Sequence, residues 1–325
     1  MKKKILGYIL VSLLLILCLS VCADYLGWGG NAVQVSVPQG SGATEIVQLL
    51  KENKVITHPR IFLQYIKEEA LHLKAGVHAF TKGMGYAEVL EELKRDVPLE
   101  NMRTVTIPEG YEVREIAALL EGAGIVQAAD FLEACQRAHR DFSFLPKDGN
   151  VEGYLFPATY SFLPDSDASL VAGAMFDAFQ DKMFTKENIF RAKELSMTFH
   201  EALTLASIIE REAAKAEESA LVSSVFHNRL KQNMRLESCA TVQYILKERK
   251  DVLSVADTKI ISPYNTYQNA GLPPSPISSP GESSLSAALY PADTPYLFFV
   301  ADGNGGHTFS QTYEEHISAA GITGR

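Results

Sequence analysis

The sequence predicts an α+β protein with three parts: an N-terminal transmembrane helix, small α+β modules, and a mixed α+β domain built around a helix that carries a glutamate. Three observations support this prediction. Residues 5–23 are uncharged, a strand–turn–helix pattern occurs twice in the first half of the chain, and residues 203–230 place Glu212 on an apolar helical stripe. With 325 residues, the chain is long enough for two or three compact units.

Composition narrows the class of protein. A hydrophobic content of 46% and a charged content of 21% are typical of a globular chain. The net charge of −9 argues against nucleic acid as a partner, because phosphate binding needs a basic surface. Cys135 and Cys239 lie far apart in the sequence, and this spacing indicates neither a disulfide framework nor a set of metal ligands. A disulfide bridge between these two cysteines stays open. We therefore predict no metal and no cofactor.

The first 23 residues predict a membrane anchor. Lys2, Lys3 and Lys4 form a short cytoplasmic tail, residues 1–4, before the uncharged run of residues 5–23. Nineteen helical residues span about 28 Å, close to the thickness of a bilayer core. This orientation places the rest of the chain on the extracytoplasmic side. A cleaved signal peptide or lipidation at Cys22 is the alternative.

A strand, a turn and two helices follow the expected linker of residues 24–31. The strand covers residues 33–37 and the helices residues 44–54 and 59–73; a further strand and helix are expected at residues 75–80 and 86–95. The pattern recurs as a strand at 104–107 and a helix at 113–121, after a hinge at 99–103. The offset of 70 aligns Pro38 with Pro108, Gly40 with Gly110, Glu45 with Glu115, Ile46 with Ile116, Leu49 with Leu119 and Leu50 with Leu120.

This repeat sets the domain boundaries. We expect an α+β module over residues 24–100, a second related βαα segment over residues 101–145, and a larger domain over residues 146–325. Modules of this kind suit the binding of an extended polymer, but they are equally suited to be spacers.

A helix is expected at residues 131–144, within the second segment, and the larger domain begins with an aromatic stretch at residues 151–160, which is either core packing or a set of sugar-stacking platforms. Helices are expected at residues 169–183, 186–195, 283–290 and 313–319, and a short one from Thr241. Strands at residues 296–300 and 307–309 flank a glycine turn. The proline-rich run at residues 262–281 is either a linker or the wall of a binding cleft.

Glu212 is the most informative residue on the helix predicted over residues 203–230. On a helical wheel it falls between Ile208 and Ile209 and close to Leu205, in the middle of an apolar stripe. A carboxyl group on such a stripe is costly to ionise, so it is a helix-edge group, a satisfied buried partner of an arginine, or a general acid with a raised pKa. Glu210 falls nearly opposite. Asn228 and Arg229 are expected to brace the helix end.

Several long strings in order give the chain a specific resemblance to the endolytic murein transglycosylase family (MltG/YceG-like). They are EGYLFPATY at 152–160, ASIIEREA at 206–213, SVFHNRL at 224–230, SPYNTYQNAGLPPSPISSPG at 262–281 and YLFFVADGNGGHTFSQTYEEH at 296–316. The resemblance implies a single-pass membrane protein with a LysM-like module before its catalytic domain. It also implies cleavage within peptidoglycan glycan strands to leave a 1,6-anhydro-N-acetylmuramic acid end, a lyase reaction that would terminate glycan elongation during cell-wall assembly.

The resemblance also implies roles for particular residues. The family's catalytic glutamate is the second Glu of an E-x-E pair, which matches Glu212; Glu210 is the reserve candidate. Substrate contacts are expected from Tyr264, Asn265, Thr266, Tyr267, Glu152 and His307, the last two with a structural alternative as loop or turn hydrogen-bonders. The chain departs from the family at Cys239-Ala240, where Asp-Pro is frequent.

Two other functions stay open. A non-catalytic membrane scaffold could bind glycan and recruit cell-wall synthesis proteins, in which case Glu212 would face a closed core. A hydrolytic muramidase would need a second carboxylate facing Glu212. The expected partners are peptidoglycan glycan strands, the cytoplasmic membrane and cell-wall synthesis proteins.

Overall fold

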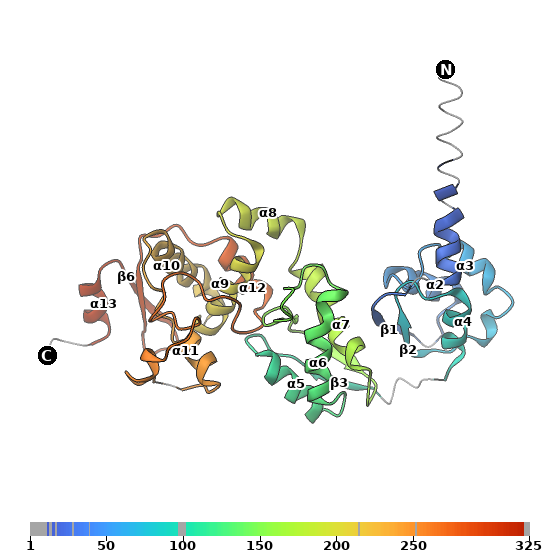
Figure 1. Cartoon of the computed structure of the whole chain (residues 1–325), viewed down its shortest axis with the longest axis horizontal. Coiled ribbons are helices and arrows are strands. Elements are labelled where there is room, and N and C mark those ends of the chain that lie inside the picture. The colour runs from blue at the N-terminus through green and yellow to red at the C-terminus, as the bar shows by residue number, and fades with distance from the viewer. Residues whose placement is uncertain are drawn as a thin grey trace, which may run out of the picture. The chain divides into compact units, whose positions relative to one another are not determined.

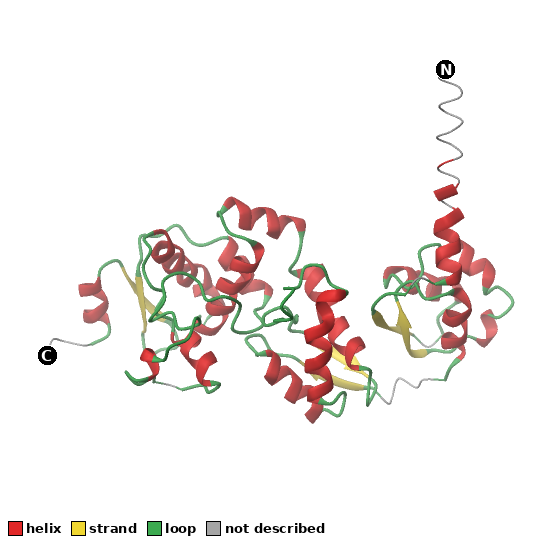
Figure 2. Ribbon diagram, in the orientation of Figure 1, coloured by secondary structure: helices red, strands yellow, loops and turns green. Residues whose placement is uncertain are grey.

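The structure is a computed structural model that describes residues 12, 15–16, 18–27, 29–38, 40–96, 102–213, 215–250 and 252–321. Short helices dominate it, and its strands form three two-stranded sheets (Figures 1 and 2). The chain divides into two compact units. The first contains residues 1–104, 120–134 and 161–174, and the second contains residues 105–119, 135–160 and 175–325. The mixed α+β class is therefore confirmed, with more helix than strand.

The N-terminal module has the order β1 (Ala32–Val37), α2 (Ala43–Glu52), α3 (Pro59–Tyr65), β2 (Gly76–Thr81) and α4 (Tyr86–Lys94). β1 and β2 are antiparallel, with Ala32 opposite Thr81 and Val37 opposite Gly76. Alternating apolar residues of β1 and the apolar faces of the helices close one core. The second predicted helix is shorter than expected, because a turn and a 3₁₀ helix (Ala70–His72) replace its last part.

The prediction of a linker over residues 24–31 is wrong for its first residues. Residues 18–26 are helical, and Asp24 is 1% exposed within the module. Its carboxylate accepts hydrogen bonds from Thr57 N (2.9 Å), Thr57 Oγ1 (2.6 Å), His58 N (2.9 Å) and Tyr86 OH (2.7 Å). Gly27 then turns the chain at a φ of +81°, against the backbone of Gly85.

The predicted internal repeat is confirmed at the level of elements. β3 (Arg103–Thr106) and α5 (Val113–Gly122) follow β1 and α2 at an offset of 70, and Gly40 and Gly110 both adopt positive φ. The matched positions are buried in both copies, as in Val35 and Val105, Val37 and Ile107, Ile46 and Ile116, Leu50 and Leu120, and Val55 and Ile125. The second copy continues through α6 (Ala128–Arg137) to β4 (Thr159–Phe162), which pairs with β3. The repeated unit is therefore βααβ, and β4 is a strand that the sequence did not predict.

The remaining elements follow in chain order. They are α7 (Ala168–Lys182), α8 (Lys186–Glu194), α9 (Phe199–Glu212), α10 (Ser219–Lys231), α11 (Cys239–Leu246), α12 (Glu282–Leu289), β5 (Phe298–Ala301), β6 (His307–Ser310) and α13 (Tyr313–Ala319). α9 packs against α8, α10, α11 and α12, so it is the central helix of the second unit (Figure 1). β5 and β6 form an antiparallel hairpin, with Phe298 opposite Ser310.

The single helix expected over residues 203–230 is wrong. α9 ends at Glu212, a 3₁₀ helix (Ala216–Glu218) follows, and α10 begins at Ser219. Alanine and charged residues in this segment favour helix, so the break has no local cause in the sequence and comes from tertiary packing. It turns the chain so that α10 packs beside α9. Asn228 and Arg229 do brace the end of α10, since both donate to backbone carbonyls of residues 294–297.

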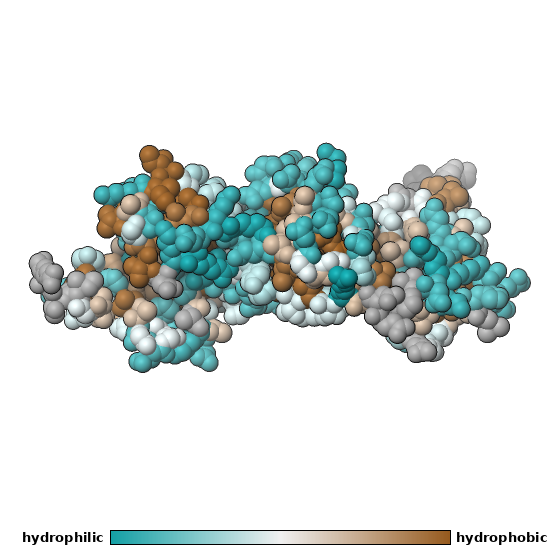
Figure 3. Space-filling view, turned by 90° about the horizontal axis from the view of Figure 1, so that it is seen from below, coloured by the Kyte–Doolittle hydropathy of each residue, from teal (hydrophilic) through white to brown (hydrophobic). Residues whose placement is uncertain are grey.

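The described surface is mainly polar, with separate apolar areas. Figure 3 shows broad hydrophilic regions interrupted by smaller hydrophobic ones. Val252, Val255 and Ile261 are among the large exposed apolar residues.

Most of the predicted transmembrane helix, residues 5–23, lies outside the described residues. Within the part of the chain that is described, no helix has the length and apolar character needed to cross a membrane.

Candidate active site

The central helix α9 is positioned by its two ends. At its start, Thr198 Oγ1 accepts a hydrogen bond from Glu201 N (3.1 Å), and Thr198 N donates to Glu201 Oε2 (2.7 Å), which completes a capping box. Leu205, Ile208 and Ile209 are fully buried, which confirms the apolar stripe predicted from the sequence. At its end, Ala213 adopts an extended conformation, so Glu212 is the last helical residue.

Glu212 meets polar groups rather than the apolar surroundings that the helical wheel predicted. Its Oε1 accepts hydrogen bonds from the Ser238 hydroxyl and from Ala240 N (3.2 Å). Both donors lie at the N-terminus of α11, where free backbone N–H groups favour a carboxylate. The wheel was misleading here because the helix ends at Glu212, and the carboxylate leaves the stripe to meet another element. Among the described residues, no hydrogen bond involves Glu212 Oε2.

The two preceding residues direct their charges elsewhere. Glu210 Oε2 accepts a hydrogen bond from Gly281 N (3.0 Å) at the N-terminus of α12. The buried Arg211 forms an ion pair with Glu112 (3.8 Å) and donates to Gln243 (3.3 Å). Burial lowers the pKa of Arg211, and the nearby Arg249 lowers it further. The last turn of α9 is therefore held in place by several different segments, each through a different side chain.

Thr266 and Tyr267, the last two residues of the predicted segment Tyr264–Tyr267, lie beside the residues that hold Glu212. Thr266 Oγ1 accepts from Ser238 N (3.0 Å) and contacts Thr241 Oγ1 (2.9 Å), and Tyr267 OH contacts the Cys239 sulfur (3.1 Å). Burial raises the pKa of the Tyr267 hydroxyl, which stays neutral. These contacts place Thr266 and Tyr267 next to the N-terminus of α11.

The four residues of this segment differ in accessibility. Asn265 and Thr266 are buried; Asn265 Nδ2 donates to Thr258 O (3.1 Å) and Ile260 O (2.7 Å), so these two side chains brace the loop from inside. Tyr264 and Tyr267 are half-buried and reach the surface. Of these four residues, the two tyrosines are therefore the ones that reach the surface.

Glu152 is buried, with 7% of its surface exposed. Its Oε1 accepts from Val113 N (2.9 Å) at the start of α5, and its Oε2 accepts from Tyr244 OH (3.5 Å). Burial raises the pKa of Glu152 to about 8, assisted by the charges of Glu112 and Glu115. The next residue, Gly153, has a φ of +85° and packs against Pro276, where a side chain would clash. These contacts match the alternative that the sequence left open for Glu152, that of a residue that hydrogen-bonds within a loop or turn.

His307 lies at the start of β6. Its Nδ1 contacts Glu218 Oε2 (2.8 Å), and its backbone N–H donates to Glu218 Oε1 (3.2 Å). The hydrogen bond from His307 lowers the pKa of Glu218. His307 thus fastens the β5–β6 turn to the segment between α9 and α10, and its hydrogen bonds do not reach Glu212.

Sequence reasoning missed Ser238 and the Ala240 N–H as partners of Glu212. A serine before a helix is a common N-cap signal, but Ser238 makes no side-chain cap to its own helix and gives its hydroxyl to Glu212 instead. Tyr244, the partner of Glu152, was also missed. The bridge that stayed open between Cys135 and Cys239 is absent, because both are free thiols, Cys135 buried and Cys239 exposed.

Comparison with known proteins identifies the family. The family model described as YceG-like matches residues 35–321. The chain belongs to the YceG-like family. This family covers both units and includes Glu212, the Tyr264–Tyr267 segment, Glu152 and His307.

Named relatives of this YceG-like chain are endolytic murein transglycosylases. The Bacillus subtilis (strain 168) protein is 33% identical over 305 residues, which are 89% of this chain and 84% of that protein. The Streptococcus pneumoniae (strain D39) protein is 32% identical over 315 residues, 87% of this chain but only 57% of the longer pneumococcal protein. A crystal structure of a YceG-like protein from Listeria monocytogenes is 33% identical, covers 89% of this chain and 98% of its own, and has a TM-score of 0.60.

Proposed function

We propose that this YceG-like protein is an endolytic peptidoglycan lytic transglycosylase and that Glu212 is its general acid and base. The names of its relatives support the activity, and the geometry of Glu212 supports the residue. One carboxylate oxygen is held by Ser238 and Ala240, and the other has no hydrogen bond among the described residues. A fixed carboxyl group with one free oxygen suits two proton transfers at one place.

The proposed reaction cleaves the bond between N-acetylmuramic acid and N-acetylglucosamine without water. Glu212, protonated on its free oxygen, donates that proton to the glycosidic oxygen, and the bond from this oxygen to C1 breaks. The carboxylate then takes the proton of the C6 hydroxyl of the same N-acetylmuramic acid, whose oxygen bonds to C1 and closes the 1,6-anhydro ring. One carboxyl group is enough, because the nucleophile belongs to the substrate and the proton returns to Glu212.

Neighbouring residues would support this chemistry in two ways. Tyr267, half-buried beside the N-terminus of α11, would contact the sugars near Glu212, and the half-buried Tyr264 would contact the strand farther along α11, where its ring meets Tyr244. Asn265 and Thr266 would position the loop and Ser238 from inside. Glu152 and His307 would act through the framework, by holding the start of α5 and the β5–β6 turn.

The test is mass spectrometry of the fragments that the full-length protein in detergent releases from purified peptidoglycan. Wild type should release fragments with 1,6-anhydro ends, and Glu212→Gln should lower the rate by a hundredfold or more, roughly the contribution of a general acid or base. Glu210→Gln is the matched control, because Glu210 is bonded to Gly281 on the other side of α9, and it should keep most activity.

Each other result points to a definite alternative. Loss of activity in Glu210→Gln but not in Glu212→Gln would transfer the role to Glu210. Reducing ends from wild type would mean a hydrolase with a second carboxylate. Glycan binding without fragments from either form would favour the membrane scaffold.

The same proposal includes a location and a cellular role. Residues 5–23 would anchor the protein in the cell membrane with its catalytic domain on the extracytoplasmic side, where it would meet nascent strands, terminate their elongation and work with cell-wall synthesis proteins. Protease added to intact spheroplasts should digest the chain beyond residue 23 and leave residues 1–23, the tail with the membrane helix. Full protection of the chain would contradict this orientation.

A further inference from the structure

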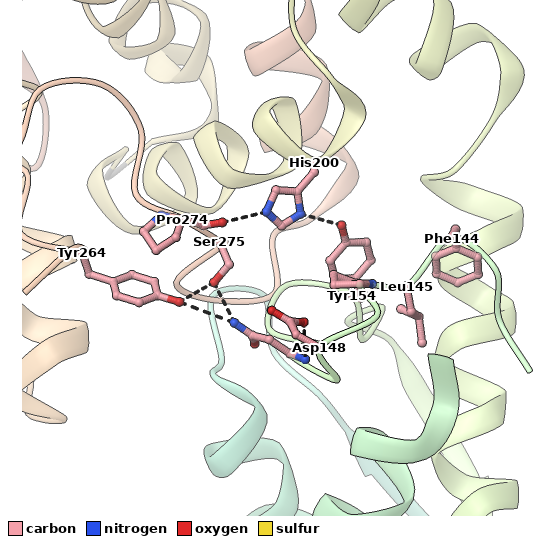
Figure 4. Close-up of a pocket in the computed structure, with 10 residues that line it drawn as sticks. Phe144, Leu145, Asp148, Tyr154, His200, Tyr264, Pro274 and Ser275 are labelled. Atoms are coloured by element: carbon pink, nitrogen blue, oxygen red, sulfur yellow. Dashed lines mark hydrogen bonds between the residues drawn. The ribbon is translucent and has the colours of Figure 1, made fainter. Parts of the chain in front are cut away.

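A pocket of about 360 Å³ lies within the second unit, beside Tyr264. This volume is within the range of small-molecule sites. Three segments line it: the connection between α6 and β4, the first turn of α9, and the proline-rich loop (Figure 4). The lining residues are Phe144, Leu145, Pro146, Asp148, Asn150, Tyr154, His200, Tyr264, Pro274 and Ser275.

Hydrogen bonds hold these walls together. His200 Nε2 donates to Pro274 O (2.9 Å), since a carbonyl only accepts, and His200 Nδ1 contacts Tyr154 OH (2.8 Å). Figure 4 shows His200 between these two partners. Ser275 Oγ accepts from Asn150 Nδ2 (2.9 Å) and contacts Tyr264 OH (2.6 Å). The pocket is thus pre-formed, which lowers the entropic cost of binding.

Asp148 is the one carboxylate among the lining residues. It is exposed, and one of its oxygens accepts from Asn150 N (3.0 Å). No hydrogen bond or ion pair in the described part of the chain involves its other oxygen. Phe144, Tyr264 and the two prolines supply apolar faces around it. A carboxylate, an amide and hydroxyl groups beside aromatic faces can meet both the hydroxyls and the C–H face of a sugar ring.

A short path of side chains connects this pocket with Glu212. Ala240, whose N–H bonds to Glu212, and Tyr244 lie four residues apart on α11 and therefore share one face, about 6 Å apart along the axis. The Tyr244 ring lies 5.0 Å from the Tyr264 ring, and Tyr264 lines the pocket. Both tyrosines are half-buried. The Tyr244–Tyr264 ring pair therefore connects the pocket with α11, the helix whose N-terminus holds Glu212.

We propose that this pocket binds a sugar residue of the same glycan strand, at a distance from the bond that Glu212 cleaves. The proposal rests on the proposed function for the identity of the polymer. A strand held at both places presents an internal bond to Glu212, so the pocket favours cleavage within long strands over cleavage of short oligomers.

The lining favours sugar over the peptide stem of peptidoglycan. A stem peptide ends in a carboxylate, and none of the ten lining residues is a lysine or an arginine that could pair with it. Asp148 would repel that group at close range. A neutral sugar ring meets no such penalty.

The test uses full-length Asp148→Ala and Asp148→Trp, the first removing the free acceptor and the second filling an exposed position of the pocket. Lys147→Ala is the matched control, because it is an exposed neighbour outside the lining. With long glycan strands stripped of peptides, KM should rise by about tenfold in both Asp148 variants, with kcat unchanged. Short oligomers that reach only Glu212 should be cleaved as by wild type.

Binding is measured separately, by co-sedimentation of the same strands with Glu212→Gln carrying each Asp148 substitution. Weaker binding of the strands by the Asp148 variants supports the pocket proposal, whether or not wild type cleaves them. A wild type that binds but does not cleave would reject the proposed function and leave the pocket proposal standing. Unchanged binding and KM for long strands overturn the pocket proposal, and so does a loss confined to strands that still carry peptides. Unchanged thermal unfolding of the variants excludes a general loss of structure.

Discussion

At the scale of single residues, Glu152 has the most unusual environment. Folding removes its carboxyl group from water and places it near Glu112 and Glu115, which raises its pKa from 4.5 to about 8. The folded state therefore holds a proton at neutral pH that the unfolded state releases. Stability from this group is complete below the unfolded pKa and is lost as pH rises through the folded pKa.

This difference predicts a pH effect. The free energy of unfolding of wild type should fall as pH rises from about 4.5 to 8, by a few kcal/mol at most. Glu152→Gln keeps an oxygen for Val113 N and has no charge, so its slope over this window should be flatter. Urea titrations at several pH values would measure both. Glu248→Gln, at an exposed site, is the control; equal slopes in all three proteins would contradict the raised pKa of Glu152.

The candidate site shows which contacts a sequence reveals. Glu212 could be singled out, because helical periodicity and the resemblance both point to it. Ser238 and Ala240 could not, since a hydrogen bond across 26 or 28 residues depends on where α11 lies. For the same reason, the sequence alone could not show that Asn265 and Thr266 face inward while their neighbours Tyr264 and Tyr267 face outward.

At the scale of elements, α9 carries Glu212 at one end and a capping box at the other. The 14-residue helix is fixed along its length by buried Leu205, Ile208 and Ile209. The cap satisfies backbone N–H groups that the first turn leaves free, far from the carboxylate. A substitution at the cap should therefore change the stability of the protein without changing the reaction at Glu212.

Thr198→Ala should lower the stability of the second unit by about 1 kcal/mol, because it removes the acceptor for Glu201 N. Calorimetry would show a lower Tm, while kcat for glycan cleavage should stay within a factor of two of wild type. Thr198→Ser keeps the hydroxyl and should restore the Tm. A Thr198→Ala protein with an unchanged Tm would show that the cap contributes nothing.

Most elements follow from local patterns, because alternating strands, amphipathic helices and glycine turns are encoded within a few residues. The repeat placed β1, α2, β3 and α5 correctly. Two errors have non-local causes. β4 was missed because its residues look like part of an aromatic stretch until β3 pairs with it, and residues 203–230 were joined because only packing breaks a helix-favouring sequence there.

At the scale of the whole molecule, Asp24 is the residue that fastens the N-terminal helix to the N-terminal module. The described helix of residues 18–26 is fastened to the module by the Asp24 carboxylate. Burial alone would raise the pKa of Asp24, but hydrogen bonds from Thr57, Tyr86 and His58 hold it below its ordinary value. The module is therefore joined firmly to the segment that we propose as its anchor.

Asp24→Asn should loosen this junction, because an amide replaces a charged acceptor of several hydrogen bonds. Hydrogen exchange at the amides of Thr57 and His58 should become at least tenfold faster at pH 7. A carboxyl group whose pKa is lowered by folding stabilises the folded state at pH values above its unfolded pKa of 3.8. This stabilisation is lost as the pH falls through the folded pKa. The difference between variant and wild type should therefore shrink below pH 4. Protection that is equal at pH 7 would refute the role of Asp24.

The two βααβ copies differ mainly in one connection. Ten residues separate α3 from β2, whereas 21 residues separate α6 from β4. Asp148, Asn150, Glu152 and Tyr154 all lie in that longer connection. The paired strands and the helices therefore have the same order in both copies, and the second copy differs by a loop long enough to supply pocket-lining residues. Changes of sequence in this loop can alter the pocket without changing the strands and helices that support it.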